Sequence, residues 1–85
     1  MTIQDLYQWF LTYLLPYKDN DDYGKRWIAF TALADMFIVN RKDYLHLISV
    51  CSCIINKRFN DPYLWDWINE NKLELPYEIQ TINTI

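Results

Sequence analysis

The scarcity of glycine constrains this chain more than any other feature: its 85 residues include one Gly and three Pro. Tight β-hairpin turns depend on glycine, so the composition disfavours an antiparallel sandwich or barrel. Four Trp, seven Tyr and four Phe, in a chain that is 52% hydrophobic, distinguish it from disordered sequences. We therefore expect an all-α fold, in a single helical domain that spans residues 1–85.

Apolar residues recur at helical spacing in four segments. The spacing predicts a compact bundle of about four helices, over residues of about 3–15, 22–39, 41–58 and 62–69. A helix-start signal precedes each segment: Thr2 with Asp5, then Asp21 or Asp22, then Asn40 with Asp43, and finally Asp61 before Pro62.

The second predicted helix contains the most apolar stretch of the chain, WIAFTALADMFIV at residues 27–39. A helix that is apolar nearly all round is normally buried, so we expect this helix at the centre of the bundle. The first helix has a wider apolar side than one neighbour requires. Trp9, on its flank, is therefore a candidate for contact outside the domain.

The C-terminal tail, residues 73–85, is compatible with two conformations. Leu73, Leu75, Tyr77 and Ile79 lie at strand spacing, whereas Ile79 and Ile82 also suit one helical turn. Both conformations remain open, and the tail could pack on the bundle or on a partner.

One polar stretch, KDNDDYGKRW at residues 18–27, looks most like a binding loop. A calcium loop that started at Asp19 would have Tyr23 at position five and Phe30 at position twelve, where oxygen ligands are needed. The stretch also lacks the glycine spacing of a phosphate loop. We interpret it as a solvated connection between the first two helices.

Candidate reactive residues do not form a catalytic set. Asp35 lies within the apolar second helix, where we expect a hydrogen bond or an ion pair with an arginine of the third helix. His46 and Cys53 share a helical face, but two ligands are too few for a zinc site. Cys53 also lies too far from His46 for an activated nucleophile. We predict no catalytic residue, no metal and no cofactor, hence no enzyme.

The cysteines and the apolar runs of the sequence indicate the cellular compartment. Cys51 and Cys53 point to different sides of a helix, so we expect two reduced thiols, as in a cytosol. The N-terminus lacks the cationic start of a secretory signal, and the run at residues 27–39 is too short to span a bilayer. We expect a cytoplasmic protein without a transmembrane segment.

Aromatic residues supply the candidate interface. Trp65 and Trp67, in LWDWIN, lie on different sides of a short helix, so one core can hardly bury both. Either the tail covers one indole or the indoles anchor a partner, because Trp and Tyr are enriched in binding hot spots. The predicted protein interface comprises Trp9, Trp65, Trp67 and Tyr77.

The alternative function is nucleic-acid binding through Arg41, Lys42, Lys57 and Arg58, which bracket the third helix. The net charge of −3 and the pI near 4.8 count against it, because such binders usually carry a dense basic face.

No stretch carries a family motif. In composition the chain is similar in style to small accessory proteins of phages and mobile elements that inhibit or bind a partner. We expect a small protein-binding regulatory module that blocks or tethers another protein, with a homodimer as one form of that binding.

Overall fold

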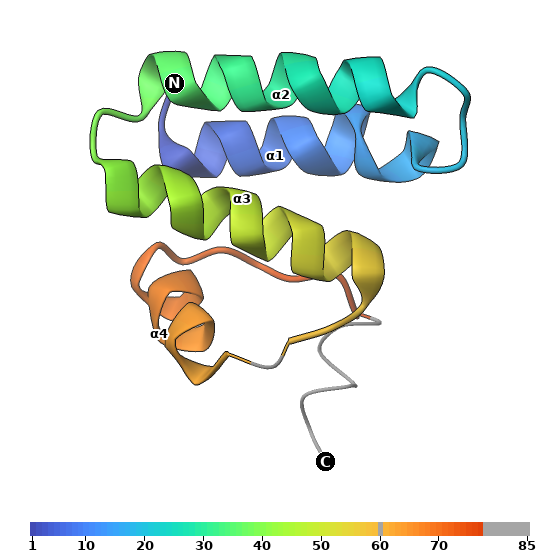
Figure 1. Ribbon diagram of the computed structural model, residues 1–85. Coiled ribbons are helices and arrows are strands. Elements are labelled where there is room, and N and C mark those ends of the chain that lie inside the picture. Colours follow the sequence, from blue (N-terminus) through green and yellow to red (C-terminus); the bar gives the residue numbers. More distant parts are fainter. Residues whose placement is uncertain (60, 78–85) are drawn as a thin grey trace.

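The computed structural model describes residues 1–59 and 61–77, and its described part is an all-α bundle without strands. The four helices are α1 (Ile3–Tyr13), α2 (Tyr23–Phe37), α3 (Arg41–Asn56) and α4 (Pro62–Glu70), and a short 3₁₀ helix, η1 (Leu15–Tyr17), follows α1 (Figure 1). The predicted fold class is confirmed, and each observed boundary lies within two residues of the predicted one.

Three helices begin at the predicted capping side chains. Oxygen atoms of Thr2, Asn40 and Asp61 accept backbone N–H bonds of 3.1, 3.1 and 2.9 Å in the first turns of α1, α3 and α4. In α1 the cap is reciprocal, because the backbone N–H of Thr2 donates to the Asp5 carboxylate at 2.9 Å. Each cap satisfies an N–H group that the helix itself leaves unpaired.

The expectation that the second helix occupies the centre is wrong. α1 and α3 pack against each other and both pack against α2, while α3 also packs against α4. Figure 1 shows α2 along one edge of the bundle. α1 buries Leu6, Tyr7 and Phe10, whereas α2 contributes Phe30 and Ala34 to the buried core. The wide apolar side of α1 thus contacts several neighbours within the chain.

The beginning of the tail is extended and lies against the bundle. Leu73 and Leu75 are buried while Glu74 between them is exposed, which matches the strand-like alternation of the sequence. The Tyr7 hydroxyl donates to the Glu74 carbonyl oxygen at 2.9 Å and so links the tail to α1. The helical turn considered around Ile79 and Ile82 lies outside the described residues.

Candidate protein interface

The acidic connection between α1 and α2 serves to join the two helices. Asp22 occupies the N-cap position of α2, but its carboxylate accepts from the side chain of Arg26 at 3.0 Å instead of from the backbone. The Arg26 guanidinium also lies over the Tyr17 ring, 4.4 Å from its centroid. Within the described residues no group of three or more His, Cys, Asp or Glu side chains is placed to hold a metal ion.

Asp35 forms the predicted ion pair with an arginine of the third helix. Its Oδ1 accepts from Nη1 of Arg41 at 2.7 Å. Asp35 does not lie in an apolar environment, because both side chains of the pair are more than half exposed. The Arg41 guanidinium also lies over the ring of Tyr44, 4.3 Å from its centroid. These contacts connect the end of α2 to the start of α3.

The cysteines and the histidine do not form a reactive site. Cys51 and Cys53 are free thiols, as predicted. Burial raises the pKa of both, and the Asp61 carboxylate raises the pKa of Cys53 further, so neither is an activated thiolate. His46 packs against the Trp67 ring at 5.5 Å between centroids, and its buried Nδ1 has no hydrogen-bond partner among residues 1–59 and 61–77. The geometry is that of a packed imidazole.

Of the two predicted anchors Trp65 and Trp67, one is buried in the core and the other is half-buried. Trp67 is 6% exposed, and its indole N–H donates to Asp43 Oδ1 at 3.0 Å. Trp65 is half-buried and packs against Phe59, with ring centroids 4.8 Å apart. Leu73 and Leu75 of the tail line the same shallow hollow as Trp65.

The other two predicted anchors differ in exposure. Trp9 is half-buried and stacks on Phe30 of α2, with centroids 5.8 Å apart and planes within 15°. Tyr77 is well exposed. Trp9 therefore joins α1 to α2, and Tyr77 is the predicted anchor whose ring is largely open to solvent.

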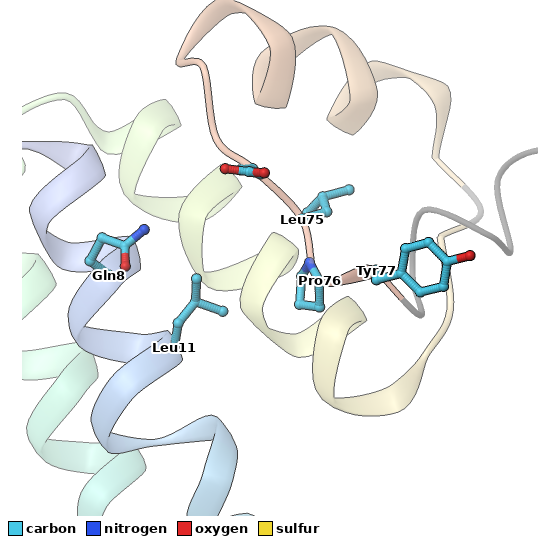
Figure 2. Close-up of a pocket in the computed structure, with 6 residues that line it drawn as sticks. Gln8, Leu11, Leu75, Pro76 and Tyr77 are labelled. Atoms are coloured by element: carbon cyan, nitrogen blue, oxygen red, sulfur yellow. The ribbon is translucent and has the colours of Figure 1, made fainter.

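Tyr77 stands at the rim of an open hollow of about 500 Å³ between α1 and the tail, which Figure 2 shows. The polar side chains of its lining are those of Gln8, Glu74 and Tyr77. We assign no ligand to this hollow, because the chain continues from Tyr77 into residues outside the described part. Its lining is Gln8, Leu11, Glu74, Leu75, Pro76 and Tyr77.

The basic residues of the nucleic-acid alternative are divided between the two ends of α3. Arg41 and Lys42 begin the helix, whereas Lys57 and Arg58 follow it. A helix of 16 residues is about 24 Å long, so the two pairs do not share one patch. Arg41 also forms an ion pair with Asp35.

The feature that sequence reasoning missed is an apolar stripe on the outside of α2. Ile28 and Met36 are 68% and 73% exposed, and the exposed Ala32 lies between them at helical spacing. Val39, just beyond the helix, is also fully exposed. We define the α2 outer face as the exposed residues on this side of the helix: Gly24, Lys25, Ile28, Ala29, Ala32, Asp35 and Met36.

Fold and site thus define a class: a small all-α bundle with an apolar outer helix face. No protein-family model matches the chain, and neither a curated protein nor a solved structure was found to be similar to it. Among the helices that the structure describes, none combines the length and the apolar character needed to cross a membrane.

Proposed function

We propose that this chain is a protein-binding module, accessory or regulatory in role, and that its contact surface is the α2 outer face. The observation that carries the proposal is the exposure of Ile28 and Met36 two turns apart on one side of α2. Single exposed apolar side chains are ordinary, but a continuous apolar stripe on one helix face is typical of interaction sites. A partner that covers the stripe would gain binding free energy of about 25 cal/mol for each Å² of apolar surface removed from water.

The inner side of α2 supports this assignment. Phe30 and Ala34 are fully buried, and Trp27 packs against Phe30 with ring centroids 5.9 Å apart. The stripe on the opposite side is therefore not needed to hold α2 to the bundle. A helix with apolar residues on both sides can pack on its own domain and on a partner at once.

The proposal assigns no reaction to the chain. The carboxylates of Asp22, Asp35 and Asp43 each accept a hydrogen bond from a side chain of the same fold, a pattern that structural roles explain. We do not carry the nucleic-acid alternative forward, because its basic residues lie at opposite ends of α3.

The proposed contact residues differ from those that the sequence predicted. Ile28 and Met36 replace Trp67, whose ring is buried. Trp9, Trp65 and Tyr77 stay predictions as contact residues, and the first two also pack within the bundle. Blocking or tethering of the partner, the mode of action expected from composition, is part of the proposal.

Site-specific photo-crosslinking in the native cell tests it. A photoreactive residue is introduced at position 28 or 36, and at position 63 as a control, since Tyr63 is 76% exposed on α4. We expect a discrete crosslinked protein species from positions 28 and 36 that position 63 does not give. Equal products at all three positions, or none at 28 and 36 from a folded chain, would contradict the proposal.

A further inference from the structure

We propose that the α2 outer face binds a second copy of this chain, with the two α2 helices antiparallel across a two-fold axis. This inference rests on the proposed function, because it names the partner of the same surface. It follows from the order of large, small and charged residues along the face, which is complementary to itself when one copy is reversed.

Side-chain sizes along the α2 outer face favour one antiparallel register. In the antiparallel register that sets Ile28 opposite Ala32 of the second copy, the numbering also sets Met36 opposite Gly24. All four positions are exposed. A Cβ added at Gly24 would meet no atom within 4 Å, so the space above this residue is open to a side chain of the second copy. Each large side chain therefore faces a small one, which lets two helices approach closely.

The same register also pairs opposite charges. Lys25 stands opposite Asp35 of the second copy, and the symmetry repeats this pair once. Asp35 Oδ1 already accepts from Arg41 within the chain, but a carboxylate has about four acceptor positions and can also receive a lysine. Both Lys25 and Asp35 are exposed, so the intermolecular pair requires no burial of an isolated charge.

Lys25 and Asp35 also select the direction of the pair. A parallel pair about a two-fold axis would set Lys25 opposite Lys25 and Asp35 opposite Asp35, which like-charge repulsion opposes. The antiparallel pair replaces both contacts with pairs of opposite charge.

The area of the α2 outer face indicates how strongly two copies should associate. A helix of 15 residues is about 22 Å long and about 10 Å wide, so its outer face covers roughly 220 Å² in projection. Stable interfaces bury about 800 Å² of accessible surface per partner. A contact built on one helix pair therefore belongs to the weak class, and dimerisation should depend on concentration.

Sedimentation equilibrium on the whole chain, from tens of micromolar to millimolar, tests the inference. We expect the mass to rise with concentration from 10.4 kDa towards twice that value. Ile28→Glu should hold the chain at the monomer mass at every concentration. Tyr63→Glu, which changes an equally exposed residue on α4, should leave the association intact. A wild-type chain that is monomeric at millimolar concentration, or a dimer that survives Ile28→Glu, would overturn the inference.

Charge reversal tests the register. Lys25→Glu and Asp35→Lys should each weaken association by about tenfold, because each converts two symmetric attractive pairs into repulsive ones. The double variant should recover most of that loss. Gly24→Leu should also weaken association, by filling the space assigned to Met36. Failure of the double variant to recover affinity would contradict this register.

The two proposals can fail separately. A monomeric chain that crosslinks from positions 28 and 36 to a different protein would refute self-association and support the protein-binding function. A chain that neither associates nor crosslinks from these positions would refute both. Circular dichroism of each variant establishes that a lost contact does not reflect a lost fold.

Discussion

Tyr7 and Glu74 lie 67 positions apart in the sequence, yet the tyrosine hydroxyl donates a 2.9 Å hydrogen bond to the glutamate carbonyl oxygen. A second bond, from Gln4 Nε2 to the carbonyl oxygen of Asn71 at 2.8 Å, runs between the same two segments. α1 is thus covered by α2 and α3 and is also tied to the C-terminal segment. α1 is therefore covered on several sides, whereas α2 lies along the edge of the bundle (Figure 1).

Tyr7→Phe removes the hydroxyl and leaves the Glu74 carbonyl without this donor. We expect the free energy of unfolding to fall by about 1–2 kcal/mol, the usual effect of deleting one partner of a partly buried hydrogen bond. Urea denaturation measures the change. Tyr63→Phe, at an exposed tyrosine of α4, is the matched control and should have no measurable effect. Equal stability of Tyr7→Phe and wild type would show that the bond contributes nothing.

Alkaline pH should destabilise the fold. Burial, and then the nearby Cys51 and Glu74 charges, raise the pKa of Tyr7 above its ordinary value of 10.0. Burial, followed by the charge of Cys53, raises the pKa of Cys51 well above 9.0. The folded chain therefore keeps protons that the unfolded chain loses. Stability should be fully present below pH 9 and fall above it, by up to about 1.4 kcal/mol per pH unit for each group.

Denaturant titrations at pH values between 7 and 10.5 measure this slope. Cys51→Ala should reduce the decrease in the free energy of unfolding that begins near pH 9. Tyr7→Phe should reduce the decrease that begins near pH 10. Both effects are expected whatever each variant does to stability at neutral pH. Stability that stays level up to pH 10.5 in the wild type would contradict the burial of both groups.

Trp67 should matter more for stability than Trp65. Trp67→Phe removes the hydrogen bond to Asp43 and part of a buried ring, so we expect a loss of about 2–3 kcal/mol. Trp65 is half-buried, and Trp65→Phe should cost about 1 kcal/mol or less. Urea denaturation of the two variants side by side provides the comparison. A larger loss for Trp65→Phe would contradict the assignment of Trp67 to the core.

Gly24→Ala should stabilise α2. Gly24 has a negative φ, and an added Cβ meets nothing within 4 Å, so alanine fits without strain. Alanine favours a helix by up to about 1 kcal/mol over glycine, and we expect roughly half of this in the first turn. Ala32→Gly, the reverse change on the same exposed face, should destabilise by a similar or larger amount. A rise in thermal midpoint for Gly24→Ala and a fall for Ala32→Gly would agree with the account. A fall for both would not.

Local signals in the sequence predicted the helices well. Thr2, Asn40 and Asp61 each cap a helix through a side-chain oxygen, as their positions indicate, because capping depends on residues within one turn. An ion pair between Asp35 and an arginine of the third helix was also predicted, but it forms at the surface, where burial does not require a partner.

The arrangement of the helices was not predictable in the same way. Periodicity shows which sides of a helix are apolar, but the neighbour that covers each side depends on contacts distant in sequence. The apolar side of α2 around Ile28 and Met36 therefore suggested burial and proved to be exposed. The sequence indicated that one core can hardly bury both Trp65 and Trp67, but not which indole is buried. Trp67 is buried with its N–H bonded to Asp43, and Trp65 is half-buried against Phe59.

Residue-level mapping of self-association tests the central claim most directly. Amide spectra of the isotope-labelled chain are compared at about 50 µM and about 1 mM, a range that spans a weak interface. We predict concentration-dependent shifts along the α2 outer face, strongest around Ile28 and Ala32, with α4 unchanged. Shifts centred on α4 or on the hollow beside Tyr77, or spectra that are identical at both concentrations, would contradict it.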